Sequence, residues 1–166
     1  MTGTSEDEFS PNVAMSRAMM VTVLYRLEDE PEVTGDIPFT DVKDDEWYTD
    51  AILWASQNNI VYGYGNGTFG LNDLITREQL VTILNRYAQS KEMDVSASVD
   101  LTEYSDLKDI SDWALTAMKW AVAAGIIKGR AESAIAPRGT ATRAEAATIF
   151  MRYVGIFPDA AGDSNN

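Results

Sequence analysis

The segment Phe69-Gly-Leu-Asn-Asp-Leu-Ile-Thr76-Arg77 decides the fold, because the chain contains two further copies of its pattern. Phe9-Ser-Pro-Asn-Val-Ala-Met-Ser16-Arg17 lies 60 residues upstream, and Ile135-Ala-Pro-Arg-Gly-Thr-Ala-Thr142-Arg143 lies 66 residues downstream. After each Arg, apolar residues recur at positions +3, +4, +6, +7 and +10, which is the spacing of one face of an α-helix. The chain is therefore predicted to be a repeat protein whose units share one core.

A second helix precedes this segment in two of the three units. Its residues recur 66 positions apart, so that Trp47, Ala51, Trp54, Ala55, Ile60 and Gly63 correspond to Trp113, Ala117, Trp120, Ala121, Ile126 and Gly129. No such helix precedes the first copy, where Gly3 stands at the position of the two later glycines. Each complete unit is expected to consist of an extended lead-in, a helix, a glycine-bounded loop and a capped helix.

We predict an all-α fold in which helix-loop-helix repeats form one composite domain with three lobes and pseudo-threefold organisation. Residues 1–30 form the second half of an incomplete first repeat, residues 37–90 the second repeat and residues 102–156 the third. Residues 157–166 are expected to be a disordered tail. One helix pair cannot bury its own apolar face, so the repeats must share a core.

Composition excludes several classes of function. The 166 residues carry 13 Lys and Arg against 26 Asp and Glu, a formal net charge of -13 at pH 7. This charge argues against nucleic acid or an anionic membrane as the partner. The chain has no Cys and no His, which excludes disulfides, thiolate or imidazole metal sites and His-dependent catalysis. We expect no metal, no cofactor and no membrane insertion.

The residues around each signature Arg predict both a cap and a candidate site. Ser16, Thr76 and Thr142 precede the apolar pattern by the distance expected of helix N-caps. The Arg that follows stands at the first helical position, where the helix dipole disfavours a cation by about 0.3–1 kcal/mol.

Two explanations for the Arg stay open. It pairs with an Asp of a neighbouring unit, Asp41 or Asp106, or it forms an anion site together with free N–H groups of the helix N-terminus.

Other repeated residues also have two interpretations each. Trp47 and Trp113 are either core anchors or flat surfaces for a sugar ring. Asp41 and Asp106 either cap the Trp helix or hold the signature Arg. The Arg at position +9 recurs as Arg26, Arg86 and Arg152, and we interpret it as a structural residue near the helix C-terminus.

Several motifs together resemble the S-layer homology repeat. They are Phe39-x-Asp41-Val, Trp47-Tyr48-x-x-Ala51-Ile52, Ile60-Val-x-Gly63, Gly67-Thr-Phe69, Ile75-Thr76-Arg77-Glu78 and Ala141-Thr142-Arg143-Ala144-Glu145-Ala146. The resemblance implies a three-lobed helical module of a longer exported protein, located at the bacterial cell surface. It also implies non-covalent binding of secondary cell-wall polysaccharide, often through pyruvylated sugars, or of modified peptidoglycan.

The candidate ligand-binding residues follow from the motifs and the resemblance. They are Arg17, Arg77, Arg143, Trp47, Trp113, Asp41, Asp106, Gly63, Gly129, Thr76 and Thr142. The units are not identical, because the first has Ser16-Arg17-Ala18-Met19 and the second has Thr76-Arg77-Glu78-Gln79 in place of the family's Thr-Arg-Ala-Glu. The three sites are therefore not expected to be equivalent.

Two alternatives to a non-catalytic cell-wall anchor remain. A protein–protein interaction module, including a homodimer through the incomplete first repeat, is favoured by the apolar face left without a Trp helix. A glycan-cleaving enzyme with two carboxylates is the weaker alternative, since no acidic pair stands out from the general acidity.

Overall fold

The computed structural model describes residues 10–131 and 133–158, and within them the regular elements are helices joined by loops, with isolated β-bridges between the loops. The α-helices are α1 (Arg17–Leu27), α2 (Thr49–Gln57), α3 (Arg77–Ser90), α4 (Leu115–Ala123) and α5 (Arg143–Ile156). Two short 3-10 helices, η1 (Leu107–Asp109) and η2 (Asp112–Ala114), lead into α4. The all-α prediction is confirmed. Gly3, Phe9 and residues 159–166 of the predicted tail lie outside the described residues.

The three signature helices begin where the sequence predicts, because their caps form. The Ser16 hydroxyl oxygen accepts a hydrogen bond from the Met19 N–H at 3.2 Å. Thr76 and Gln79 form a reciprocal capping box at the start of α3, as do Thr142 and Glu145 at the start of α5. The predicted N-caps are therefore confirmed in all three units.

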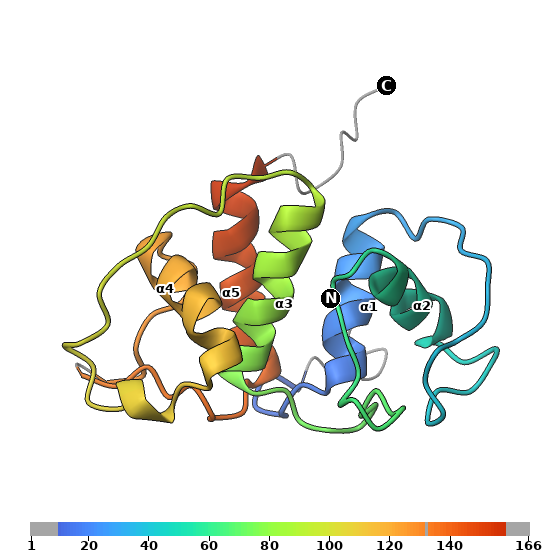
Figure 1. Ribbon diagram of the computed structural model, residues 1–166, viewed down its shortest axis with the longest axis horizontal. Helices are drawn as coiled ribbons and strands as arrows, with labels where there is room; N and C mark the ends of the chain where they lie inside the picture. The colour runs from blue at the N-terminus through green and yellow to red at the C-terminus, as the bar shows by residue number, and fades with distance from the viewer. Residues whose placement is uncertain (1–9, 132, 159–166) are drawn as a thin grey trace.

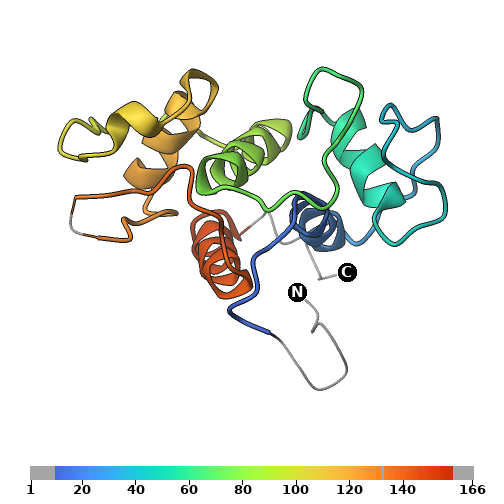
Figure 2. The same cartoon turned by 90° about the horizontal axis from the view of Figure 1, so that it is seen from below.

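A closed ring of backbone hydrogen bonds joins the segments that precede α1, α3 and α5. The Met15 N–H donates to the Ala141 carbonyl at 2.9 Å, the Ala141 N–H to the Ile75 carbonyl at 3.0 Å, and the Ile75 N–H to the Met15 carbonyl at 2.8 Å. All three residues are fully buried. The helices consequently start from one junction and run side by side through the centre of the molecule (Figure 2).

The Trp helices pack on the outside of this central group. Helix α2 lies against α1, and α4 lies against α3 (Figure 1). Trp54 and Trp120, which are 7% and 1% exposed, bury their indoles in the core as their helical spacing predicts. Phe157, predicted to begin the tail, instead stacks on Trp120 with ring centres 6.2 Å apart.

Candidate functional site

The signature Arg side chains are buried and join successive units. Arg17, 6% exposed, donates from Nε to the Phe69 carbonyl at 3.0 Å and from Nη2 to the Tyr62 carbonyl at 3.3 Å. Arg77, 4% exposed, donates in the same way to the carbonyls of Ile135 at 2.9 Å and Lys128 at 2.5 Å. Each guanidinium thus ties the start of its helix to the loop of the next unit. Burial lowers the pKa of both.

The predicted salt bridges between these Arg residues and Asp41 or Asp106 are wrong, since neither forms among the described residues. The Asp41 carboxylate accepts the N–H groups of Phe69 and Gly70 at 2.7 and 2.8 Å, and Asp106 accepts the equivalent pair in the third unit. The alternative that these residues cap the Trp helices is also wrong, because α2 and α4 begin without a side-chain cap. Each Asp instead holds its lead-in against the loop that carries the Arg-binding carbonyls.

Hydrogen bonds set the ionisation of Asp41. Burial alone would raise the pKa of its carboxyl, but the N–H donors of Phe69 and Gly70 outweigh burial and lower the pKa. The carboxylate is therefore the form that the folded loop requires.

The expectation that the helix N-termini offer free N–H donors is wrong. The backbone N–H groups of Arg17, Arg77 and Arg143 donate to the carbonyls of Asp73, Gly139 and Val13 at 2.9–3.0 Å. The next N–H of each helix is paired with the same three loops. The third N–H donates to the cap side chain. An anion therefore cannot bind at these helix ends through the backbone.

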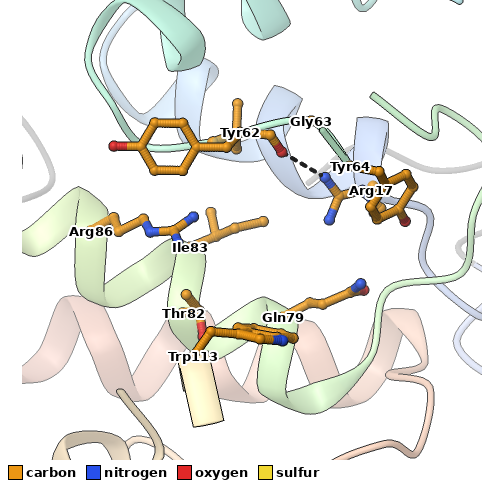
Figure 3. Close-up of a pocket in the computed structure, with 10 residues that line it drawn as sticks. Arg17, Tyr62, Gly63, Tyr64, Gln79, Thr82, Ile83, Arg86 and Trp113 are labelled. Carbon is orange, nitrogen blue, oxygen red and sulfur yellow. Dashed lines mark hydrogen bonds between the residues drawn. The ribbon is translucent and has the colours of Figure 1, made fainter. Parts of the chain in front are cut away.

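An open cavity nevertheless lies beside Arg17, and we call it the Arg17 groove. Its volume is about 470 Å³, and it is lined by Arg17, Val61, Tyr62, Gly63, Tyr64, Gln79, Thr82, Ile83, Arg86 and Trp113. The first unit contributes the Arg, the second the loop after α2 and one face of α3, and the third the indole (Figure 3). The volume falls in the range of about 300–1,000 Å³ typical of small-molecule sites.

Two cations and three aromatic rings meet in this groove. The Cζ atom of Arg17 lies 4.8 Å from the ring centre of Tyr64, and that of Arg86 lies 4.6 Å from the ring centre of Tyr62. Arg17 and Arg86 face the cavity from opposite sides, and Trp113 lies across it from Tyr62 (Figure 3). Burial lowers the pKa of Arg86, whose guanidinium forms no salt bridge within the described residues.

Arg17 keeps donors for a ligand in spite of its internal bonds. A guanidinium has five N–H groups. Its hydrogen bonds within the described residues use Nε and one N–H of Nη2, which leaves three. The groove can therefore present charged N–H donors beside aromatic surface, a combination suited to an acidic sugar.

The structure brings together three of the predicted site residues: Arg17, Gly63 and Trp113 line the groove. Trp113 is 54% exposed, so the core-anchor interpretation is wrong for it. The same interpretation is wrong for Trp47, which is 57% exposed, but Trp47 contacts Tyr48 edge-on and does not line this groove.

The remaining predicted residues have structural positions. Thr76 and Thr142 act as caps, and Asp41 and Asp106 hold loops. A Cβ atom at Gly63 would collide with the Thr68 carbonyl and the Phe39 ring, and one at Gly129 would lie 2.7 Å from the Ala131 carbonyl oxygen. Arg143 is buried, like the other signature Arg residues.

The surroundings of Arg77 differ from those of Arg17. Arg130, which stands where the first groove has Tyr64, binds the Glu145 carboxylate with two hydrogen bonds of 2.9 and 2.7 Å. Its Nη2 also donates to the Thr140 carbonyl at 2.6 Å. The two units are consequently not equivalent, as their different motifs predict.

Seven groove residues were not predicted as site residues from the sequence: Val61, Tyr62, Tyr64, Gln79, Thr82, Ile83 and Arg86. The repeated Arg at position +9 was a signal for Arg86. The sequence interpretation placed this Arg near the helix C-terminus: Arg26 lies in the last turn of α1, whereas α3 and α5 continue for four residues past Arg86 and Arg152.

Two other classes of site are absent from the described part of the chain. Residues 10–131 and 133–158 contain no group of three or more Asp or Glu placed to hold a metal ion. No helix in these ranges combines the length and apolar character needed to cross a bilayer.

Known proteins resemble the chain throughout the repeats. The model of the S-layer homology domain matches residues 38–81 and 103–147. The chain is 35% identical over 147 residues to the amylopullulanase of Thermoanaerobacterium thermosulfurigenes, which covers 89% of this chain and 8% of that protein. It is 32% identical over 155 residues to the surface-layer 125 kDa protein of Lysinibacillus sphaericus, covering 92% and 13%.

The cellulosome-anchoring protein of Acetivibrio thermocellus is 29% identical over 149 residues, which is 87% of this chain and 33% of that protein. The chain thus spans between 8% and 33% of the length of these three relatives. The family match places the chain at the bacterial cell surface. Because the matched repeats cover more than half of it, the chain belongs to the S-layer homology domain family.

Proposed function

We propose that this chain is a non-catalytic module that binds an acidic secondary cell-wall polysaccharide in the Arg17 groove. S-layer homology domains anchor surface proteins to the cell wall. The single observation that carries the finer proposal is the groove itself, in which Arg17 and Arg86 meet Tyr62, Tyr64 and Trp113 around about 470 Å³.

The chemistry of the groove fits a pyruvylated sugar. A ketal pyruvate carries one carboxylate, which the remaining N–H groups of Arg17 and Arg86 can bind as charge-assisted hydrogen bonds. The Trp113 and Tyr62 rings, which lie on opposite sides of the groove (Figure 3), offer apolar faces for the sugar ring, and the indole N–H and the phenol hydroxyl supply polar atoms. The hydroxyl of Thr82 and the amide of Gln79 add further hydrogen-bonding groups.

Binding of this kind relies on short-range contacts. The net charge of -13 repels an acidic polymer at long range, so electrostatic steering does not assist association. Affinity is therefore expected to depend only modestly on ionic strength, in contrast to a basic patch that binds a polyanion.

The roles proposed for the other candidate residues follow from their positions in the repeat. Arg77 and Arg143 are proposed to support the corresponding positions in the other units, of which the one beside Arg77 is closed by Arg130, with Thr76 and Thr142 as caps and Asp41 and Asp106 as loop holders. We also propose that the domain has three lobes with pseudo-threefold organisation. The closed ring formed by Met15, Ile75 and Ala141 supports this arrangement.

The test is a pull-down with purified wall polysaccharide, with and without its ketal pyruvate. We expect the wild-type chain to bind the pyruvylated polymer and to release it when the pyruvate is removed. A chain that binds neither form contradicts the proposal.

A second candidate function, protein–protein interaction, is favoured by an apolar cavity of about 550 Å³ between α1 and α5. Tyr25, Asn85 and Met151 occupy equivalent positions, eight residues after the signature Arg of their helices. Tyr25 is covered by α2 and Asn85 by the third unit, so that they are only 9% and 6% exposed. The equivalent residue on α5, Met151, is 68% exposed and lines this cavity. Light scattering tests the homodimer: a dimer that Met151→Asp dissociates supports it, and a monomer at every concentration contradicts it.

A further inference from the structure

The carboxylate of Glu78 is buried and reaches into the third unit. Glu78 is the second residue of α3 and is 4% exposed. Its two oxygens accept hydrogen bonds from Ser111, one from the backbone N–H and one from the hydroxyl, each at 2.9 Å. Ser111 is the residue that precedes η2, and its hydroxyl does not cap that helix. The contact therefore ties α3 to the start of η2.

This contact lies next to the indole of the groove. Trp113 is the middle residue of η2, two positions after Ser111, and it lines the Arg17 groove beside Gln79 and Thr82 of α3 (Figure 3). Its side chain is 54% exposed, so burial does little to hold it. Glu78 holds the turn that carries it through two hydrogen bonds to Ser111, one from the backbone N–H and one from the hydroxyl.

The helix itself does not require a Glu at this position. The equivalent residues of α1 and α5 are Ala18 and Ala144, and both helices begin with a hydroxyl N-cap and with equivalent backbone pairing. The carboxylate is thus specific to the unit that forms the wall of the open groove.

We propose that Glu78 is a positioning residue that holds Trp113 over the Arg17 groove and so sets the affinity for the sugar ring. The inference rests on the proposed function of that groove. Glu78 touches Ser111 and acts on the ligand only through the placement of the indole.

A double-mutant cycle tests this coupling. Binding of a pyruvylated disaccharide prepared from wall polysaccharide is measured for Glu78→Ala, Trp113→Ala and the double variant. We expect Glu78→Ala to weaken binding about tenfold and the double variant to bind no more weakly than Trp113→Ala alone, because the two residues act as one unit. Additive losses, or unchanged affinity in Glu78→Ala, overturn the proposal.

Two matched variants distinguish an effect on the position of Trp113 from the loss of the negative charge of Glu78. In Glu78→Gln the amide oxygen can still accept from the Ser111 N–H while its NH₂ group donates to the hydroxyl, so affinity is expected to stay near that of wild type. Glu103→Ala removes the same charge from an exposed position of the third unit and is expected to leave affinity unchanged. If Glu103→Ala weakens binding as much as Glu78→Ala, net charge explains the effect and the proposal fails.

The fluorescence of Trp113 in the free protein tests whether Glu78 holds the indole without any need for a ligand. In a Trp47→Phe background Trp113 is the exposed indole, because Trp54 and Trp120 are 7% and 1% exposed. We expect Glu78→Ala to increase acrylamide quenching of Trp113 and to lower its fluorescence anisotropy, and unchanged values contradict the proposal.

Ser111→Ala, which removes one of the two hydrogen bonds, is expected to give an intermediate change and replaces Glu78→Ala if that variant does not fold. If wild type binds no glycan, the proposed function fails while the fluorescence result still decides the role of Glu78.

Discussion

The guanidinium of Arg86 lies 4.6 Å from the ring centre of Tyr62, which connects the middle of α3 to the loop after α2. The pair forms one side of the Arg17 groove and holds a cation at a cavity in a chain whose net charge is -13. Among the described residues no carboxylate neutralises this guanidinium. Its charge is therefore free to act on a ligand.

Replacing Arg86 is expected to affect binding more than stability. A hydrogen bond to a charged group contributes about 1.5–3 kcal/mol, so Arg86→Ala should weaken glycan binding by at least about tenfold in calorimetry. Loss of the cation–π contact should cost no more than about 1 kcal/mol of unfolding free energy. Arg26→Ala, at the same repeat position outside the groove, is the control and should bind like wild type. Equal losses in the two variants contradict a specific role for Arg86.

Replacing Arg77 is expected to affect stability first. Its guanidinium is buried and donates to two carbonyls of the third unit. Arg77→Ala should therefore lower the free energy of unfolding by about 2–4 kcal/mol in urea titration, because two acceptors lose their charged donor. An unfolding free energy within about 0.5 kcal/mol of wild type would show that these contacts contribute little.

Arg130 is expected to close the second groove. Arg130 and Glu145 are both about one-third exposed, so breaking their salt bridge should change stability by only about 0–1 kcal/mol. Arg130→Ala should expose a second glycan site, which calorimetry would detect as an increase in stoichiometry. Unchanged stoichiometry with intact binding at the first groove would show that the Arg77 position is not a site.

Stability should fall in acid through Asp41. The pKa of its carboxyl is lowered below the ordinary value of 3.8 in the folded chain, so the unfolded chain takes up the proton first as the pH falls. The stabilisation is complete above the unfolded pKa and is lost as the pH falls through the folded pKa. Unfolding free energy should thus be level down to about pH 5 and decline below about pH 4.

Asp41→Asn is the matched variant for this measurement. Its amide can accept only through one oxygen, so the loop loses part of its hydrogen bonding at neutral pH. We expect this variant to be less stable than wild type at neutral pH and to show a smaller decline in acid. An equal decline in both proteins would assign the acid sensitivity to other carboxylates.

Local sequence signals predicted the helices and their caps. Ser16, Thr76 and Thr142 each accept a hydrogen bond from the residue three positions later, so both partners of each cap lie within four consecutive residues of the sequence. The buried Trp54 and Trp120 follow in the same way from helical spacing. Both features depend on residues that are close together in the sequence, so a local sequence pattern is enough to predict them.

Contacts between units could not be predicted from the same patterns. The carbonyls of Tyr62 and Phe69 that receive Arg17 lie 45 and 52 residues away, and backbone oxygens carry no signature in the sequence. Asp41 was expected either to cap the Trp helix or to hold the signature Arg, yet its carboxylate accepts two backbone N–H groups of its own unit. The prediction of an anion site at the helix ends was wrong because backbone carbonyls of other units occupy the N–H groups there. The donors that stay available are side chains of the Arg17 groove.

The central claim is that an acidic sugar binds between Arg17, Arg86 and Trp113. The most direct measurement is a nuclear magnetic resonance titration of the chain with a pyruvylated disaccharide, following the side-chain N–H signals of the two Arg residues and the indole N–H of Trp113. We predict that these three signals shift together, and that the same disaccharide without pyruvate moves only the indole. Saturable binding that leaves all three signals in place, or no binding at all, would contradict the account.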